Sequence, residues 1–141
     1  MDHLAILDKK MKMLSRIVSG KKKIESRWYK FKRTPYQNIS VNDSIYFKES
    51  GDPVTVKARV NKVLFFDDLD DYKIKEILKE YGSEICVPIS YYKKLIGKKF
   101  CTLVFIDNIQ RLNAFNVDKK GYGLMNAWIT INDIKSIRKI D

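Results

Sequence analysis

The sequence predicts an α+β fold in which about five to six mostly antiparallel strands form a small curved sheet or barrel, with two to three helices beside it. The chain has 141 residues, of which 45% are hydrophobic and 32% charged, as expected for one globular domain spanning residues 1–141. Apolar residues alternate with polar ones for about ten residues from Val54, which is the period of a half-buried strand. A strand of that length favours a curved antiparallel sheet or a small barrel.

The first third of the chain predicts a strand, a helix and a second strand. The apolar stretch Leu4–Leu7 is either a first strand or the front of the following helix. Asp8 is suited to cap a helix over 9–19 that has one apolar side. Gly20 suits the left-handed position that ends a helix. A strand over 23–31 follows at once.

The remaining elements are placed by the same patterns. Strands are expected at 44–48, from Val54 for about ten residues, at 100–109 and at 127–131. Helices are expected at 71–81, ended by Gly82, and at 90–96, capped by Ser90, with a closing turn or short helix at 134–140. The segment 113–123 is polar, contains glycine and is expected to be a loop.

The residue inventory argues against several kinds of catalytic or metal site. Cys86 and Cys101 each lie among apolar residues and are expected to be buried, reduced thiols. With His3 as the one histidine and no CxxC motif, there is no zinc constellation, and a Ser-His-Asp or Cys-His site would have to use the end of the chain. The acidic cluster at 67–71 could be a magnesium site, but it is explained by carboxylates favouring a helix start. We expect no metal and no cofactor.

The same patterns predict a cytoplasmic protein. The longest strongly apolar run, at 103–106, is far too short to cross a bilayer. The first eight residues lack the basic start and long apolar core of a signal peptide. No membrane association is therefore expected, and the oligomeric state stays open.

Positive charge is concentrated in the first 33 residues. The whole chain has a net charge of +11, and residues 1–33 hold eleven Lys and Arg against three acidic residues. Such a basic segment indicates a polyanion as partner, although a solvated lysine-rich surface would look similar. The aromatic residues Trp28, Tyr29 and Phe31 are interleaved with the cations. This favours nucleic acid, because bases stack on rings while lysines hold phosphates.

The octet Gly20-Lys21-Lys22-Lys23-Ile24-Glu25-Ser26-Arg27 joins the first helix to the second strand. Strand alternation places Glu25 and Arg27 on one face, with Trp28 on the opposite, core-facing side. Lys22 can reach the Glu25 and Arg27 face only from the turn after Gly20. The octet therefore predicts an amine, a carboxylate and a guanidinium close together.

The octet matches the pattern G-x-K-x-x-E-x-R at Gly20, Lys22, Glu25 and Arg27. It resembles the signature of the ASCH domain family, a branch of the PUA-like β-barrel superfamily, and the order of elements from Leu4 to Ile137 is similar as well. The family usually has Gly-Asp before its third strand, where this chain has Asn42-Asp43. The helices expected within about 67–97 look like an insertion between barrel strands.

The resemblance implies a cleft that binds RNA or a nucleotide-like ligand. The RNA recognised there could be single-stranded or carry a modified base. Residues 21, 22 and 27 (two lysines and an arginine) would hold phosphate or a base edge, and Glu25 would accept from an amino group or orient Arg27. Stacking candidates are Tyr29, on the Glu25 face, and Trp128, which is open to assignment as core or cleft rim. The candidate binding residues are Lys21, Lys22, Glu25, Arg27, Tyr29 and Trp128.

A hydrolase acting on a nucleoside or RNA is the alternative. Small bacterial relatives of the family remove the acetyl group from N4-acetylcytidine with a lysine and a threonine of this motif. Lys22 matches that lysine, but Glu25 stands at the threonine position, and a carboxylate does not replace a hydroxyl nucleophile. In such an enzyme, or in a ribonuclease, Lys22 would be an activated amine and Glu25 the general base or acid. A structural ion pair between Glu25 and Arg27 that binds nothing is the plain explanation of the octet. A regulatory protein partner is a third hypothesis, which the sequence neither supports nor excludes.

Overall fold

The computed structural model describes residues 1–123 and 125–140. The strands are β1 (Asp2–Leu7), β2 (Ile24–Tyr29), β3 (Ser44–Glu49), β4 (Val54–Phe66), β5 (Phe100–Phe115) and β6 (Trp128–Ile131). The α-helices are α1 (Met13–Val18), α2 (Asp71–Ile85) and α3 (Tyr92–Leu95). Short 3-10 turns are η1 (Lys9–Met11), η2 (Ile89–Tyr91) and η3 (Ile134–Ile137).

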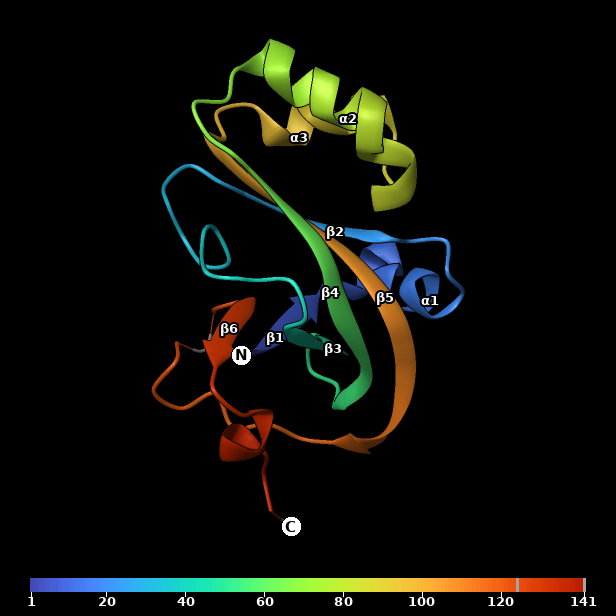
Figure 1. The fold of residues 1–141 in the computed structure, drawn as a ribbon, viewed down its shortest axis with the longest axis vertical. Helices are drawn as coiled ribbons and strands as arrows, with labels where there is room; N and C mark the ends of the chain where they lie inside the picture. Colours follow the sequence, from blue (N-terminus) through green and yellow to red (C-terminus); the bar gives the residue numbers. More distant parts are fainter. Residues whose placement is uncertain (124, 141) are drawn as a thin grey trace.

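The six strands form one mixed sheet in the order β2-β5-β4-β3-β1-β6. β1 pairs parallel with β3, and the other neighbours are antiparallel. The sheet curls into a half-barrel along the two long strands β4 and β5, with α2 and α3 at one end and η3 at the other (Figure 1). The predicted α+β fold with a small, mostly antiparallel barrel-like sheet is therefore confirmed.

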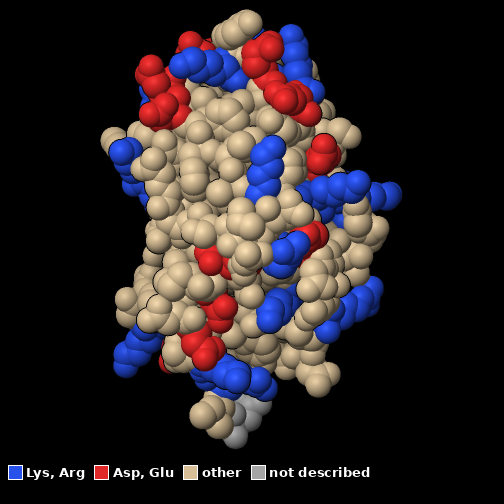
Figure 2. Space-filling model, viewed as in Figure 1, with Lys and Arg blue, Asp and Glu red and all other residues tan. Residues whose placement is uncertain are grey.

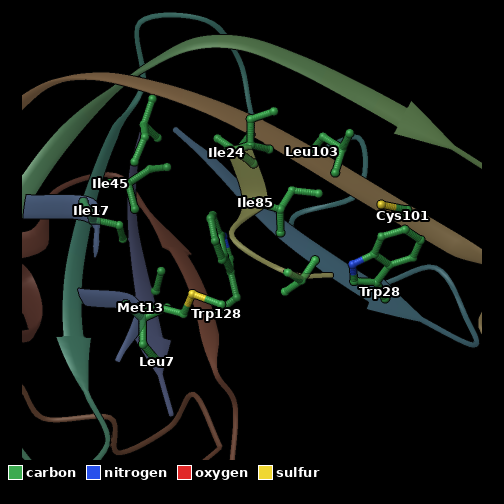
Figure 3. Close-up of a cluster of buried hydrophobic side chains, with 14 of the residues drawn as sticks. Leu7, Met13, Ile17, Ile24, Trp28, Ile45, Ile85, Cys101, Leu103 and Trp128 are labelled. Carbon is green, nitrogen blue, oxygen red and sulfur yellow. The ribbon is translucent and has the colours of Figure 1, made fainter. Parts of the chain in front are cut away.

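The main core joins the sheet to the three α-helices. Its fully buried members include Ile17 of α1, Ile24 of β2 and Phe47 of β3. Figure 3 shows part of this cluster, where residues from the helices and from both ends of the sheet order come together. A smaller cluster joins β1 and β6 to η3, so the last elements are fixed to the sheet by apolar packing.

The helix predicted at 9–19 is interrupted. Lys12 adopts a left-handed conformation (φ 53°) that separates η1 from α1. Asp8 does cap the first turn, accepting from the Lys10 amide at 2.9 Å. Met13 and Ile17, four residues apart on α1, are its buried residues. Gly20 has the predicted positive φ, 83°.

Two helix boundaries were predicted wrongly. The helix expected to stop at Gly82 continues to Ile85, and Cys86 takes the left-handed position (φ 71°). A Cβ at Gly82 would lie 3.1 Å from the Val87 carbonyl oxygen, so the glycine serves close packing and not termination. The helix expected at 90–96 is η2 followed by α3, and Pro88, without a side-chain cap, precedes it in place of Ser90.

β5 is also longer than predicted, because it extends past 109 to Phe115. Its pairing with β4 shifts register at three places, and Asn108 has a positive φ of 51°. Such irregularities let a long strand bend while it stays paired. The residues at 113–115 thus belong to the strand and not to the predicted loop. None of the helices in the described part of the chain has the length and hydrophobicity needed to cross a bilayer.

Candidate functional site

The site lies where the half-barrel remains open. β2 and β6 are the two ends of the strand order among the described residues. Arg27 of β2 spans this opening, since its Nη1 donates to the Ala127 carbonyl at 3.3 Å and its Nη2 to the Ile6 carbonyl at 3.2 Å. A single guanidinium therefore connects β2 to β1 and to the residue before β6.

Lys22 is held at the end of α2. Only 2% of Lys22 is exposed, and its Nζ donates to the carbonyls of Ile24 (2.8 Å) and Ile85 (2.9 Å). Ile85 is the last residue of α2, whose final carbonyls lack partners within the helix and favour a cation. The third neighbour is Glu25, with its Oε1 at 3.5 Å from Nζ. The turn after Gly20 thus brings Lys22 to Glu25.

Glu25 completes a buried cluster of three charges. Its Oε1 accepts from the Ser26 amide at 3.0 Å, and its Oε2 lies 3.4 Å from the Arg27 Nη2. Burial on its own would raise the pKa of Glu25, but the nearby cations of Lys22 and Arg27 and the Ser26 amide outweigh burial and lower that pKa. The carboxylate is therefore ionised at neutral pH. The predicted meeting of amine, carboxylate and guanidinium occurs.

A cleft of about 710 Å³ opens beside this cluster. Lys22, Glu25 and Arg27 line it together with apolar residues of α1, of the α2–α3 region and of β2. Its volume lies in the range of small-molecule sites, about 300–1,000 Å³. The cluster is thus buried against protein on one side and open to a cavity on the other.

Further cations surround the cleft. Lys94, Lys98 and Lys119 all line it. Tyr91 lies among them, with the Lys94 Nζ at 5.7 Å from its ring centroid. Burial and the negative charge of Glu25 raise the pKa of Tyr91, while Arg27 acts in the opposite direction. The Tyr91 hydroxyl therefore stays protonated beside the charged cluster.

The outer surface of the protein is mixed in charge. In Figure 2, acidic side chains gather at the end occupied by α2, interspersed with lysines, while Lys and Arg line the edge over α1. The positive charge of the first 33 residues is thus spread around α1 and the turn before β2, and the cleft receives its lysines largely from other segments.

The other predicted binding residues are placed differently. Lys21 is exposed and does not line the cleft. Tyr29 lines it, with the Arg33 guanidinium 5.2 Å from its ring centroid. Trp128 is only 4% exposed and lies under the Arg27 guanidinium at 5.1 Å. A stacking role for Trp128 does not fit this burial, and the indole instead supports Arg27 from behind.

His3 belongs to a closed network near this wall. Its Nε2 is 2.8 Å from the Asp43 carboxylate, and its Nδ1 is 2.9 Å from the Thr130 hydroxyl and 3.2 Å from the Trp128 Nε1. Burial lowers the pKa of His3 despite the opposing Asp43 carboxylate. Because the Trp128 indole N–H can only donate, Nδ1 must accept, and the neutral ring donates to Asp43. His3 therefore ties β1 to β6 and is fully buried.

The segment between β4 and β5 contributes residues to the cleft that were not predicted from the sequence. Tyr91, Lys94 and Lys98 reach the cleft from η2, α3 and the residues after it. The run Tyr91-Tyr92-Lys93-Lys94 was a usable signal, because it places two rings directly beside two cations. In the described part of the chain, no three His, Cys, Asp or Glu side chains are grouped as metal ligands. Asp70 instead caps α2, accepting from the Lys73 amide at 2.8 Å.

Comparison with solved structures identifies the fold. The crystal structure of the ASCH protein from Zymomonas mobilis matches with a TM-score of 0.70, covering 98% of this chain and 96% of that chain at 17% identity. The chain has the ASCH fold. A Tyr-to-Phe variant of the same ASCH protein gives a TM-score of 0.71 at 17% identity over 96% and 93% of the two chains. A Ser-to-Ala variant gives 0.70 at 18% identity over 96% and 91%.

The resemblance to the ASCH family first seen in the octet is confirmed at the level of the fold. No protein-family model matches the sequence, and no curated protein matches it. The motif residues at Gly20, Lys22, Glu25 and Arg27 thus lie in a chain with the ASCH fold and with 17–18% identity to these structures.

Proposed function

We propose that this chain binds single-stranded RNA, with a nucleotide seated in the cleft beside Lys22, Glu25 and Arg27. The observation that carries the proposal is the opening of this buried three-charge cluster into a cavity of about 710 Å³. Stability alone is a weak reason to keep such a cluster, since buried ion pairs often offset little of their desolvation. Contact with a ligand in the cavity would explain why the three charges are kept there.

The surroundings of the cleft fit a phosphate-bearing ligand. Lys94, Lys98 and Lys119 would attract phosphates, and the ring of Tyr91 is placed among them. Lysines that hold phosphates together with aromatic rings that stack on bases are the usual basis of single-strand binding. The net charge of +11 would favour the encounter with RNA at long range.

The contacts of Lys22 favour binding over hydrolysis. An ammonium group has three N–H donors, and Lys22 Nζ has three acceptors within 3.5 Å, namely Ile24 O, Ile85 O and Glu25 Oε1. A lysine that acts as nucleophile or base must lose a proton and present a lone pair. The Lys22 Nζ is instead surrounded by acceptors of the protein itself, and its contact with Oε1 orients Glu25.

Salt-dependent binding tests the proposal. We expect a labelled single-stranded RNA hexamer to bind with an affinity that falls steeply as salt rises. The double variant Lys94→Ala/Lys98→Ala should bind more weakly and lower the slope of log affinity against log salt by roughly 0.7 for each lysine removed. Fluorescence anisotropy over a salt series measures both quantities.

Lys93→Ala is the matched control. Lys93 neighbours Lys94 on α3 and is exposed, but it does not line the cleft. Its substitution should leave the affinity and the slope nearly unchanged. Equal effects of Lys93→Ala and Lys94→Ala, or undetectable binding by the wild-type chain, would contradict the proposal.

A further inference from the structure

The segment 30–33 after β2 carries an aromatic ring in open solvent. Phe31 is 79% exposed, and Lys30, Lys32 and Arg33 beside it in the chain are exposed as well. Among the described residues, no hydrogen bond or ion pair holds the Lys30 or Lys32 side chain. Because its ring lies in water, packing of the core does not account for Phe31, and the two lysines are free to contact a ligand.

One end of this segment lies beside the cleft wall that follows α3. The Lys99 amide donates to the Tyr29 carbonyl at 2.9 Å, and a Cβ added at Gly97 would lie 3.9 Å from the Lys30 Cε. Lys98, between these two contact points in the chain, lines the cleft. Lys30 thus adds a cation next to the Lys98 side of the cleft.

The other end of the segment reaches the residues before β6. The Arg33 Nη2 donates to the Asn126 Oδ1 at 2.7 Å, and the guanidinium carbon lies 5.2 Å from the Tyr29 ring centroid. Tyr29 and Asn126 both line the cleft. Asn126 also lines a smaller hollow of about 290 Å³, together with Arg33. Phe31 therefore lies in the chain between two residues that contact the rim of the cleft.

The surroundings of Phe31 suit one more nucleotide of an RNA strand. Bases stack on exposed rings while nearby lysines hold the phosphates. Tyr72 is also strongly exposed, at 71%, but it follows Asp70 and Asp71 at the start of α2, at the end of the molecule where acidic side chains gather (Figure 2). A second copy of this chain is a poorer occupant of the segment 30–33, because both copies carry a net charge of +11.

We propose that Phe31 stacks on the base next to the nucleotide in the cleft, with Lys30 and Lys32 against the phosphates of the strand. This inference rests on the proposed function and adds the length of the ligand. The protein recognises a strand that leaves the cleft along the segment 30–33. A free nucleotide makes only the contacts of the cleft.

The test compares a mixed-sequence RNA hexamer with a mixture of the four nucleoside 5′-monophosphates. Phe31→Ala should weaken binding of the hexamer about tenfold, as the loss of one stacked base would give. It should leave the affinity for the mononucleotides unchanged, because they do not reach Phe31. Fluorescence anisotropy measures the labelled hexamer directly and the mononucleotides by competition.

Phe31→Trp reports the stacking itself. An indole stacks on a base as a phenyl ring does, so this variant should keep the affinity for the hexamer. The emission of the new indole should fall when a base stacks on it. The wild type, in which Trp28 and Trp128 are both buried, supplies the background to be subtracted.

Tyr72 provides the matched control. Tyr72→Ala removes a ring of similar exposure that does not line the cleft, and it should leave the affinity for the hexamer unchanged. The indole of Tyr72→Trp should keep its emission. Because Phe31 and Tyr72 are both exposed, none of these substitutions should unfold the protein.

The outcomes separate this inference from the proposed function. Unchanged hexamer affinity in Phe31→Ala, or unchanged emission of Phe31→Trp at saturation, overturns the inference while RNA binding stands. Equal weakening of hexamer and mononucleotides by Phe31→Ala also overturns it, because Phe31 would then belong to the cleft. A wild-type dimer that Phe31→Ala abolishes in sedimentation would identify a second copy as the occupant and overturn it. Failure of the wild type to bind the hexamer overturns both.

Discussion

Two arginine–carboxylate pairs on this sheet differ in both distance and exposure. Arg59 of β4 meets Asp107 of β5 with two hydrogen bonds of 2.9 and 2.7 Å. Their side chains are 45% and 35% exposed. Arg27 and Glu25 on β2 approach only to 3.4 Å, but their side chains are 13% and 7% exposed. The shorter pair faces water, and the longer pair faces the cleft.

The two pairs differ in how far their hydrogen-bonding groups are satisfied by the protein. Asp107 also accepts from Asn61, and Arg59 also donates to Asn42. The hydrogen bonds from Arg59 and Asn61 lower the pKa of Asp107. This pair is satisfied by protein. In the cleft, the Glu25 Oε2 has one contact among the described residues, the Arg27 Nη2 at 3.4 Å, and so keeps accepting capacity beside a cavity.

The largest effect is expected at Lys22. Lys22→Met removes the cation but keeps most of the side-chain volume. The buried negative charge of Glu25 then loses one of its two neighbouring cations, and the Ile85 carbonyl at the end of α2 loses its donor. Removing one partner from a buried charged pair costs about 3–5 kcal/mol. Urea unfolding at neutral pH measures this loss in the free energy of unfolding.

Lys23→Met is the control for that variant. Lys23 is exposed and adjacent in sequence, so its substitution removes the same charge from the same segment. It should change the free energy of unfolding by less than about 0.5 kcal/mol. Similar losses in Lys22→Met and Lys23→Met would show that the Lys22 contacts do not stabilise the fold.

A smaller, pH-dependent effect is expected at Glu25. Its pKa is lowered in the folded protein by Lys22 and Arg27, against the opposing effect of burial. The stability that the ionised group contributes is therefore full above its unfolded pKa of about 4.3 and is lost as the pH falls through the folded pKa.

The comparison of wild type with Glu25→Gln isolates this contribution. At neutral pH the wild type should be the more stable of the two in urea unfolding. The difference should shrink as the pH falls below about 4.3. A difference that grows with acidity would mean that burial dominates and that the Glu25 pKa is raised.

The smallest effect is expected at the exposed pair. Arg59→Ala should lower the melting temperature less than Lys22→Met does, because exposed pairs are screened by water and salt. The loss should diminish further at about 1 M salt. Thermal unfolding at low and high salt measures it, and a loss larger than that of Lys22→Met would reverse our ranking of the two regions.

The fold and the centre of the site were predictable because their determinants are local. Glu25 and Arg27 lie two residues apart on one strand, and Gly20 provides the turn that brings Lys22 to them. The half-buried strand from Val54 was visible in its alternation, although its end at Phe66 was not.

The rest depends on contacts between distant segments. The Ile85 carbonyl that binds Lys22 comes from a helix predicted to end at Gly82, and only the packing of Gly82 against Val87 shows why it continues. Trp128 looked equally suited to core or rim, and its burial follows from the Arg27 and His3 contacts. The run of rings and cations at 91–94 marked Tyr91 and Lys94 as candidates, but their position beside β2 depends on the fold of the whole segment between β4 and β5.

Chemical-shift mapping with a single-stranded RNA hexamer tests the central claim most directly. The Ser26 amide, which donates to Glu25, reports on the cleft, and the Asn61 side-chain amide, which donates to Asp107, reports on the exposed pair. We predict that RNA shifts the Ser26 signal and those of residues lining the cleft, while the Asn61 signal remains in place. Shifts confined to the Arg59 and Asp107 region, with Ser26 unmoved at saturation, would contradict the account.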